Sequence, residues 1–265
     1  MNMDKWTSGA DYDQWMGRWS RLLAQGFLDW LNLPTDLRWL DVCCGSGIVT
    51  QAIVERDAPA SVVGVDASSD QIDFARQHRA YPNVTFETAD AMALPFPDST
   101  FDVAVCGLGL NFIPSRDRAL KEFRRVIRPG GTVAIYVWDY AQGARFLREF
   151  WDAAAAIDPE AATFDQARRF PMCTQKALRS LFEQGKLQDL TTHVLEVVTR
   201  FTSFEDYWAP LQTGQGSAPN YLATRGKKIQ AAIRERLRAA LPANAQGVIE
   251  LPARAWAIRA RNPGV

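Results

Sequence analysis

The sequence has no long apolar run, few metal-binding side chains and no excess of charge of either sign. Its 265 residues include only 4 Cys and 2 His, and no two cysteines are spaced as Cys-x-x-Cys, so a zinc or iron–sulfur site has almost nothing to be made of. The 30 Lys and Arg balance the 30 Asp and Glu, which removes the electrostatic attraction that dominates general nucleic-acid binding. We therefore predict no metal site and no nucleic-acid partner.

Targeting and membrane signals are missing as well. No stretch approaches the ~18 uninterrupted apolar residues that span a bilayer. Residues 1–15 carry three Asp and no apolar run, unlike the hydrophobic segment of a signal peptide. The adjacent Cys43 and Cys44 are a poor pair for a disulfide, so we expect reduced thiols. These absences predict a cytoplasmic protein with no membrane span.

The sequence does contain an alternation of short apolar runs with amphipathic stretches, which is typical of βαβ units and a parallel sheet. The expected strands are Trp39–Cys43, Val62–Val65, Val84–Thr88, Val103–Cys106 and Val133–Trp138. The expected crossover helices are Val49–Arg56, Asp70–Arg79 and Arg116–Ile127, the last of them stopped by Pro129-Gly130-Gly131. Further along, residues 145–157 and 174–185 look helical, and residues 192–201 and 248–261 look like strands.

Amphipathic segments flank this core. Apolar residues at steps of three and four predict one helix over about Tyr12–Leu31. Residues 204–241 look mainly helical around a Gly-rich break at Thr213–Ser217. Residues 225–261 carry nine Lys and Arg against two Glu, which we interpret as a solvated face. We expect a single domain over residues 1–265, in which 1–35 form a lid helix, 36–140 the cofactor-binding core and 203–241 a helical substrate cap.

The most informative segment is Trp39–Gly47, in which an apolar strand leads directly into a Gly-x-Gly turn and then a helix. Glycines there allow the turn geometry and the close approach of a ligand, and the helix N-terminus offers free N–H donors. Asp66 ends the second strand 19 residues beyond Gly47, the usual place of an acid that accepts both hydroxyls of a ribose. Asp90 follows the third strand. Because parallel strands share one carboxyl edge, Asp41, Asp66 and Asp90 are expected to meet there.

The acid within the first strand distinguishes between nucleotide-type ligands. A nicotinamide dinucleotide site generally has a third glycine where this chain has Thr50, and it has no need of a carboxylate at Asp41. A ligand with an ammonium group and no phosphate can pair with Asp41 through charge-assisted hydrogen bonds. S-adenosyl-L-methionine fits that description. A nicotinamide-dependent oxidoreductase and a catalytically silent cofactor-binding partner protein are the alternatives.

Six motifs together resemble the class I S-adenosylmethionine-dependent methyltransferases, in particular the ubiquinone and menaquinone biosynthesis group. They are Leu40–Gly47 (LDVCCGSG), Gly64–Ser68 (GVDAS), Ala89–Ala91, Leu94–Phe96, Phe101–Val103 and Arg125–Gly131 (RVIRPGG). The resemblance runs from about Tyr12 to Asp139. It implies an α/β fold, a doubly wound, mostly parallel seven-stranded Rossmann-like sheet, with an N-terminal helical lid and a C-terminal helical cap insertion.

The resemblance also implies which residues bind the cofactor. The methionine part would be surrounded by Asp41, Cys43, Gly45 and Gly47, and its sulfur would lie against Cys106, Gly107 and Leu108. The ribose hydroxyls would bind Asp66, with Ala67 and Gln71 beside the sugar and ring. The adenine would contact Asp90 and Ala91, and the carboxylate would contact Tyr12 and Arg18. One position departs from the family, which usually has Gly where this chain has Cys43. A small side chain fits there if φ is negative.

The expected reaction is methyl transfer to a small apolar or aromatic metabolite, at carbon or oxygen rather than nitrogen. Aromatic residues dominate the predicted lid and cap, and apolar residues follow the fourth strand. The polar and aromatic candidates for the acceptor pocket are Trp19, Asn111, Asp139, Tyr207 and Trp208. No catalytic acid or base is identified, and none is obligatory, because the sulfonium of the cofactor is already activated. The sequence does not predict an oligomeric state.

Overall fold

The structure, a computed structural model, describes residues 9–212 and 216–264. Its first half contains α1 (Gly9–Gln14), α2 (Gly17–Leu31), β1 (Arg38–Val42), α3 (Ile48–Asp57), β2 (Ser61–Asp66), α4 (Ser69–His78), β3 (Val84–Thr88), β4 (Phe101–Gly107), η1 (Leu110–Phe112), α5 (Arg116–Val126) and β5 (Ile127–Trp138). Its second half contains α6 (Arg145–Ile157), η2 (Pro159–Thr163), α7 (Gln166–Arg169), α8 (Gln175–Gln184), β6 (Gln188–Phe201), α9 (Phe204–Trp208), η3 (Ala209–Gln212), α10 (Ser217–Ala223), α11 (Lys227–Ala240) and β7 (Ile249–Arg261).

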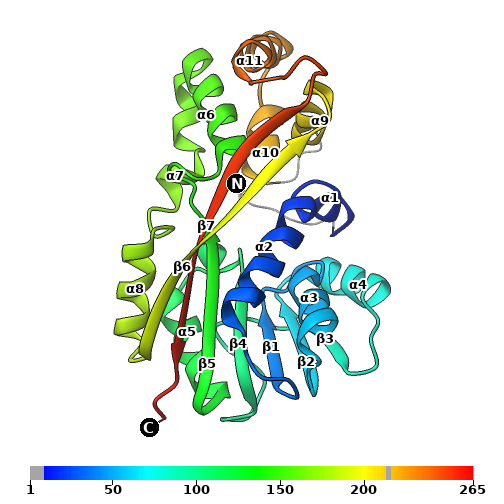
Figure 1. The fold of residues 1–265 in the computed structure, drawn as a ribbon. Helices are drawn as coiled ribbons and strands as arrows, with labels where there is room; N and C mark the ends of the chain where they lie inside the picture. The colour runs from blue at the N-terminus through cyan, green and yellow to red at the C-terminus, as the bar shows by residue number, and fades with distance from the viewer. Residues whose placement is uncertain (1–8, 213–215, 265) are drawn as a thin grey trace. The chain divides into compact units, whose positions relative to one another are not determined.

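The strands form one seven-stranded sheet in the order β3-β2-β1-β4-β5-β7-β6. Strand β1 pairs in parallel with β2 and β4, β2 with β3, and β4 with β5, so these five carboxyl ends meet at one edge. Strand β7 runs opposite to β6 (Figure 1). The doubly wound, mostly parallel sheet expected from the sequence is therefore confirmed.

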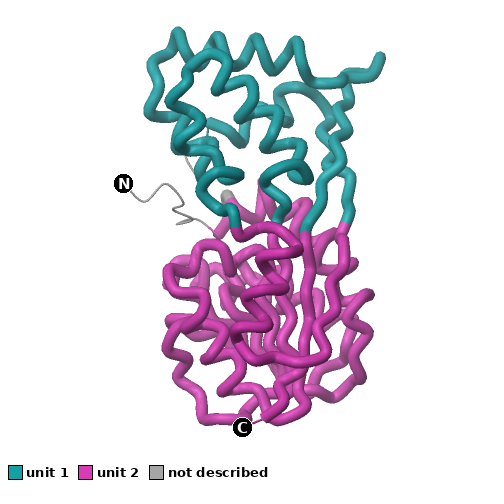
Figure 2. The backbone as a smooth tube through the Cα atoms, turned by 90° about the vertical axis from the view of Figure 1, so that its left-hand side faces the viewer, with its two compact units in different colours: residues 1–7, 138–171, 196–255 teal, residues 8–137, 172–195, 256–265 magenta. Residues whose placement is uncertain are grey.

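The chain divides into two compact units (Figure 2). Unit 2 contains residues 8–137, 172–195 and 256–265, and unit 1 contains residues 138–171 and 196–255 together with residues 1–7, which lie outside the described residues. Strands β6 and β7 contribute residues to both units. The division into lid, cofactor core and cap remains a prediction.

Unit 2 carries helices on both faces of its strands. On one face, Phe27 of α2 packs against Tyr136 of β5 with ring centroids 4.7 Å apart. Helix α3 lies on the same face. A Cβ added to Gly107 of β4 would point toward both the Tyr136 side chain, at 2.7 Å, and Val49 of α3, at 2.8 Å. Helix α5 covers the other face with α8 beside it (Figure 1). Its buried residues Ala119, Leu120, Phe123 and Val126 follow the helical spacing seen in the sequence.

Two boundaries differ from the sequence-based expectation. The single helix predicted over Tyr12–Leu31 is two helices, α1 and α2, separated by a turn at Trp15 and Met16. Both residues of the turn are buried, at 6% and 5% exposure.

The Pro-Gly-Gly motif does not stop helix α5, which already ends at Val126. Strand β5 begins at Ile127, opposite Phe101, and the pairing resumes at Thr132, opposite Val103, so Pro129-Gly130-Gly131 is a bulge inside the strand. Gly130 has a φ of +76°, which favours glycine. A Cβ on Gly131 would lie 2.6 Å from the carbonyl oxygen of Asp102.

Unit 1 is mainly helical around an aromatic core. Trp151 and Tyr221 pack with ring centroids 5.6 Å apart, and the Tyr221 hydroxyl donates a 2.8 Å hydrogen bond to Asp158. Arg225 donates to the same carboxylate at 2.7 Å. No helix among the described residues has the length and apolar character that would let it cross a membrane.

Candidate active site

The turn between β1 and α3 has three residues in the left-handed region: Cys43, Gly45 and Gly47, with φ of +58°, +52° and +79°. At Gly47 the φ of +79° favours glycine, and a Cβ would lie in tight contact, 3.1 Å from both Phe86 and Arg79. At Gly45 the nearest atom to such a Cβ is Gln71 Oε1 at 3.8 Å. The turn is therefore packed on one side at Gly47 and accessible at Gly45.

Cys43 does not have the negative φ that the sequence analysis required of a non-glycine residue there. Room for its side chain is provided by another glycine. A Cβ on Gly109 would lie only 2.4 Å from Cys43 Cβ and 3.2 Å from the sulfurs of Cys43 and Cys106. Cys43 and Gly109 are thus a matched pair, in which the missing side chain at one position makes room for the other.

Two thiols in the turn after β1, those of Cys43 and Cys44, have raised pKa values. A hydrogen bond with Cys106, followed by burial, raises the pKa of Cys43 well above its ordinary value. Burial raises the pKa of Cys44 in the same way. All four cysteines are unbridged. The neighbour of Cys43 is Cys106 on strand β4, which no sequence pattern indicated.

Asp41 is fully buried at the end of β1. Thr50 Oγ1 donates a 2.7 Å hydrogen bond to its Oδ2, and its Oδ1 has no hydrogen-bond partner among the described residues. Burial raises the pKa of Asp41 to about 7. In the sequence, Thr50 stood out only because a dinucleotide site has its third glycine at this position. Its hydrogen bond to Asp41 is visible only in the structure. The site thus contains a carboxyl group poised to ionise near neutral pH.

Asp66 connects strand β2 to the glycine-rich turn. Its Oδ2 accepts a 3.0 Å hydrogen bond from Gly45 N, and its Oδ1 accepts a 2.9 Å bond from Ser68 N. Burial raises its pKa in spite of these backbone donors. Next to it, Ala67 is exposed and Gln71 is buried. The carboxylate is fixed in orientation at the edge of the sheet.

Asp90 lies in the loop after β3, where its side chain closes a turn. Met92 N donates a 2.8 Å hydrogen bond to Asp90 Oδ1, and Ala93 N donates to Asp90 O at 2.9 Å. Asp90 is exposed and Ala91 is buried at 7% exposure. One backbone bond, from Ala89 N to Asp66 O at 3.0 Å, joins this loop to the end of β2.

The segment after β4 completes the edge. Leu108 has a φ of +60°, and its N–H donates a 2.8 Å hydrogen bond to Tyr136 O. Asn111 is 3% exposed, yet neither atom of its amide has a partner among the described residues. Ser46 is 1% exposed, and its Oγ also has no hydrogen-bond partner among the described residues. Buried polar atoms are normally satisfied, so these atoms indicate a place for a ligand or ordered water.

The first two helices are attached to this edge by ion pairs. Asp13 accepts from Arg21 at 2.6 Å and from Arg79 at 3.0 Å. Arg79 also packs against Gly47, so it joins α1 to the glycine-rich turn, and sequence analysis missed this role. Tyr12 hydrogen-bonds Ser20 at 3.1 Å. The Arg18 guanidinium lies 4.8 Å from the centre of the buried Trp19 ring.

Three predicted acceptor-pocket residues lie in unit 1, and each has an intramolecular partner. Asp139 Oδ2 accepts from Arg254 at 3.0 and 2.5 Å. The Tyr207 hydroxyl donates to Phe146 O at 2.8 Å, and burial raises its pKa. Trp208 stacks on Phe204. Their function as substrate contacts remains a prediction.

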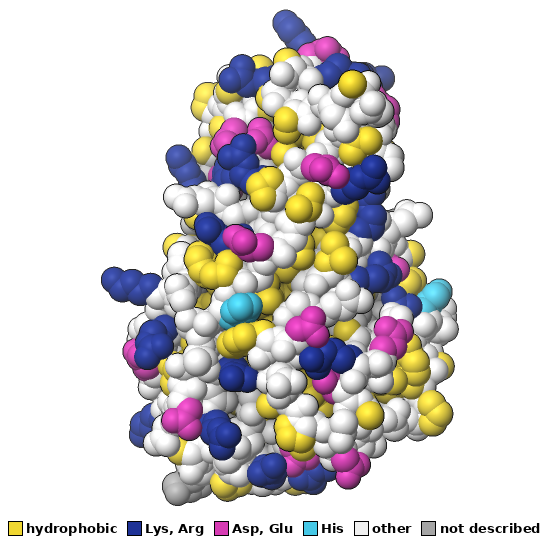
Figure 3. Space-filling model, in the orientation of Figure 1, with side chains coloured by type: hydrophobic (Ala, Val, Ile, Leu, Met, Phe, Trp, Pro, Cys, Tyr) yellow, Lys and Arg dark blue, Asp and Glu magenta, His cyan; other side chains and the backbone are white. Residues whose placement is uncertain are grey.

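Trp208 also lines a pocket of about 320 Å³ in unit 1. The other lining residues are Glu205, Gln212, Lys227, Gln230, Ala231 and Arg234. This charged lining does not suit an apolar acceptor. Within the basic 225–261 segment, Arg234 and Arg238 both pair with Glu205, at 2.6 and 2.9 Å. On the face seen in Figure 3, basic and acidic side chains are interspersed.

Comparison with known proteins identifies the class. The methyltransferase domain family matches residues 40–131. Demethylmenaquinone methyltransferase of Bacillus licheniformis is 32% identical over 177 residues, covering 62% of this chain and 75% of that enzyme. The 2-phytyl-1,4-naphtoquinone methyltransferase of Thermosynechococcus vestitus is 36% identical over 147 residues, covering 54% and 65%.

A solved structure gives the same fold. Phosphoethanolamine N-methyltransferase 2 of Haemonchus contortus, in complex with S-adenosyl-L-methionine, has a TM-score of 0.57 and 16% identity, covering 91% of this chain and 52% of that one. The chain is thus a class I S-adenosylmethionine-dependent methyltransferase. Within that class it belongs to the group of the ubiquinone and menaquinone biosynthesis methyltransferases.

The described residues contain no group of three or more His, Cys, Asp or Glu side chains arranged to hold a metal ion.

Proposed function

We propose that the carboxyl edge of the sheet binds S-adenosyl-L-methionine and that the protein transfers its methyl group to a small quinol-like or other aromatic acceptor. The observation that carries the proposal is a set of buried polar atoms with no hydrogen-bond partner among the described residues: Asp41 Oδ1 in β1, Ser46 Oγ in the turn that follows, and both atoms of the Asn111 amide after β4. Each such atom costs about 1–3 kcal/mol when no partner is present. A ligand that carries ammonium and hydroxyl groups removes that cost.

The residues present fit this cofactor. The Asp41 carboxylate would pair with its ammonium group, and Asp66, whose orientation Gly45 N and Ser68 N fix, would accept from the ribose hydroxyls. Ala67 and Gln71 would flank the sugar. Asp90 and Ala91 would contact the adenine. The backbone at Gly45 offers close approach, because a Cβ there would meet no atom within 3.8 Å.

The remaining cofactor contacts follow from the other segments of the edge. Cys43, Gly47, Cys106, Gly107 and Leu108 would surround the methionine and sulfur, and Tyr12 and Arg18 would contact the carboxylate. When bound, the cofactor supplies an electrophilic methyl group on a positively charged sulfur. The protein residues then have to align the acceptor and exclude water, and orientation of this kind is worth roughly 7 to 11 kcal/mol of barrier.

The acceptor is proposed to be an apolar ring with a hydroxyl group, methylated at carbon or oxygen. The two quinone methyltransferases described above support this class. Leu108, Leu110 and Ile113, which follow β4, are buried apolar residues beside the polar Asn111. An apolar pocket with one polar group fixes the orientation of such a ring. An acceptor that binds as its phenolate, having lost its proton to solvent, is itself a sufficient nucleophile, so no acid or base of the chain is assigned to catalysis.

We expect Asp66→Ala to weaken S-adenosylhomocysteine binding about 10- to 150-fold, because an ionised acceptor is worth about 1.5–3 kcal/mol. Asp66→Asn should be milder, since one acceptor oxygen remains. Isothermal titration calorimetry measures both. Asp73→Ala, at an exposed position of the same helix–strand unit, is the matched control. An unchanged dissociation constant in folded Asp66→Ala would contradict the ribose assignment.

Asn111→Leu tests the acceptor group. The Asn111 amide is buried and has no hydrogen-bond partner among the described residues, so an apolar side chain of similar size should stabilise the ligand-free protein by about 1–3 kcal/mol. It should also raise KM for a hydroxyl-bearing acceptor about tenfold while leaving S-adenosylhomocysteine affinity within about twofold, since an unsatisfied hydroxyl costs at least 1 kcal/mol. Urea unfolding and steady-state kinetics provide the two readouts. If KM stays the same, Asn111 does not contact the acceptor.

The cofactor proposal itself is tested by titrating the protein with S-adenosylhomocysteine and, separately, with NAD. A ligand that binds only the native state raises the unfolding temperature. We expect a rise with S-adenosylhomocysteine and none with NAD. The opposite result would favour the nicotinamide-dependent alternative. Binding without methyl transfer to any acceptor would favour a silent cofactor-binding partner.

A further inference from the structure

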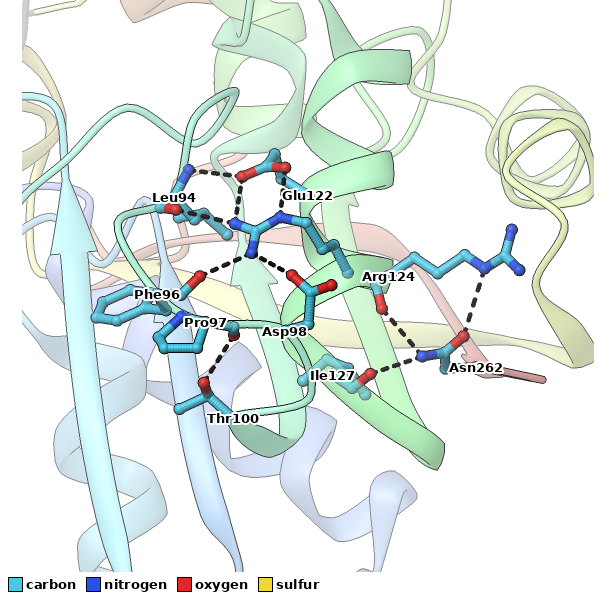
Figure 4. Close-up of polar contacts among 10 residues, drawn as sticks. Leu94, Phe96, Pro97, Asp98, Thr100, Glu122, Arg124, Ile127 and Asn262 are labelled. Carbon is cyan, nitrogen blue, oxygen red and sulfur yellow. Dashed lines mark hydrogen bonds and ion pairs between the residues drawn. The ribbon is translucent and has the colours of Figure 1, made fainter. Parts of the chain in front are cut away.

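Two sequence motifs have no place in the cofactor contacts described so far. Leu94–Phe96 lies in the loop between β3 and β4, and Arg125 begins the motif that ends in the bulge of β5. They are about thirty residues apart in sequence, but hydrogen bonds join them directly. Figure 4 shows these bonds converging from Leu94, Phe96, Asp98 and Glu122.

Arg125 uses its whole guanidinium in this contact. It donates to the carbonyl oxygens of Leu94 at 2.9 Å and Phe96 at 2.7 Å, and to the carboxylate of Asp98 at 2.8 Å. Glu122, one turn earlier on α5, accepts from Arg125 at 2.8 Å through both oxygens. Glu122 also accepts a 2.8 Å hydrogen bond from Leu94 N. Both polar groups of the Leu94 backbone are therefore fixed by α5.

This clamp, formed by Arg125 and Glu122 on the Leu94 backbone, lies next to the proposed adenine contact. Asp90 is four residues before Leu94, and the intervening turn is closed by the bonds from Met92 N and Ala93 N to Asp90. At its other end the loop is tied to Asp66 O through Ala89 N, at 3.0 Å. A short turn fixed at both ends holds its side chains in one arrangement. If the clamp is released, the Asp90 turn keeps its bond to β2, and the far end of the loop keeps the 2.9 Å backbone bond from Ser99 N to Arg125 O, but the Leu94 backbone between them is no longer held by side chains of α5.

We propose that Arg125 and Glu122 are positioning residues that hold the Asp90 loop in the geometry needed to recognise the 6-amino group of the adenine. The inference rests on the proposed function, and it assigns to the two motifs an effect on purine selectivity. Arg125 itself makes no contact with the cofactor. It acts through the loop from Asp90 to Asp98.

The neighbouring arginine supplies a matched control. Arg124 lies on the same turn of α5 but bonds to the C-terminal segment, with 2.7 Å to Gly264 O and 3.4 Å to Asn262 Oδ1. Figure 4 shows Arg124 and Asn262 on the side away from Leu94. Arg124→Met therefore removes the same charge and comparable surface bonds from the same helix without releasing the Asp90 loop.

The experiment compares two ligands that differ only at the purine: S-adenosylhomocysteine and S-inosylhomocysteine, which has a carbonyl in place of the 6-amino group. Calorimetry gives both dissociation constants for the wild type and for Arg125→Met and Arg124→Met. The wild type should prefer the adenosyl ligand at least tenfold. In Arg125→Met the two dissociation constants should differ by no more than about twofold. Arg124→Met should keep the wild-type preference. General destabilisation would weaken both ligands and leave the ratio unchanged.

Two further results separate the possible failures. A wild type that does not bind S-adenosylhomocysteine contradicts the proposed function, whereas a selective wild type and an equally selective, folded Arg125→Met contradict the positioning role alone. If Arg125→Met does not fold, Glu122→Gln replaces it, because glutamine keeps an acceptor for Leu94 N but loses the charge that holds Arg125. An intermediate ligand ratio in Glu122→Gln supports the inference, and a wild-type ratio overturns it.

Discussion

Asp41→Asn should stabilise the ligand-free protein at pH 8 by about 2–4 kcal/mol and at the same time weaken S-adenosylhomocysteine binding about 10- to 150-fold. The stability effect follows from the buried carboxyl, whose pKa is about 7 in the folded protein. In the unfolded chain its pKa is 3.8. Ionising a group displaced this far costs the native state roughly 4 kcal/mol by linkage. Asparagine stays neutral, can still accept the hydrogen bond from Thr50, and avoids the cost.

The stability difference between Asp41→Asn and wild type should increase with pH. The folded protein binds one more proton at Asp41 than the unfolded chain does between pH ~4 and pH ~7. The stability contributed by the protonated group is complete below the unfolded pKa and is lost as the pH rises through the folded value. The difference between Asp41→Asn and wild type should therefore be small near pH 4, grow up to pH ~7 and stay level above it. Urea unfolding at several pH values measures it.

Ligand affinity should change in the opposite direction. An ammonium group pairs with the ionised form of Asp41, so the wild-type dissociation constant should fall about tenfold for each unit that the pH rises toward ~7, and level off above it. Asp41→Asn should show a flat profile and the loss of one charge-assisted bond. Asp70→Asn, an exposed position on α4, is the control for both measurements. Equal affinity of Asp41→Asn and wild type at pH 8 would contradict the pairing.

Gly109→Ala is expected to lower the free energy of unfolding by about 1–3 kcal/mol and to reduce cofactor affinity. The new Cβ would lie 2.4 Å from Cys43 Cβ, and neither atom is the flexible end of a side chain. Overpacking of this kind forces backbone shifts in a well-packed core. The strain falls on the two turns after β1 and β4, which form the edge of the proposed site.

Cys43→Gly should rescue this variant, because it removes the clashing carbon and places glycine at a φ of +58°. A double-mutant cycle on unfolding free energy and on the dissociation constant of S-adenosylhomocysteine measures the coupling. Gly26→Ala is the control: it lies inside helix α2, and its nearest contact would be Leu195 at 3.7 Å. There alanine should stabilise by about 0.5–1 kcal/mol. Additive effects of Gly109→Ala and Cys43→Gly would mean that the two positions are not a matched pair.

The periodicity of the sequence predicted the part of the fold that depends on local pattern. The first five strands and the helices between them are present because short Val-rich runs and amphipathic stretches differ strongly in period. The Gly-x-Gly turn and Asp66 could also be found, since their spacing is a consequence of chain geometry. The sequence-based resemblance to class I methyltransferases is confirmed by the comparisons.

The features that were missed depend on contacts between residues far apart in the chain. Nothing near Cys43 indicates that Gly109, 66 residues later, makes room for its side chain. The pairing of Thr50 with Asp41 needs the turn to bring helix α3 back over strand β1. Likewise, the bulge at Gly130 is visible only in the register between β4 and β5. Periodicity describes which face a residue occupies, but not which residue it meets there.

The most direct test of the proposed activity is a transfer assay with S-adenosyl-L-methionine labelled in its methyl group and a reduced naphthoquinol as acceptor. We expect label in the organic phase in equal amount to the S-adenosylhomocysteine formed, and its loss in Asp66→Ala. RNA, DNA and peptide pools in parallel reactions should take up no label. Methylation of RNA that falls steeply as salt rises, or no transfer to any small aromatic acceptor by a protein that binds S-adenosylhomocysteine, would contradict the proposed activity.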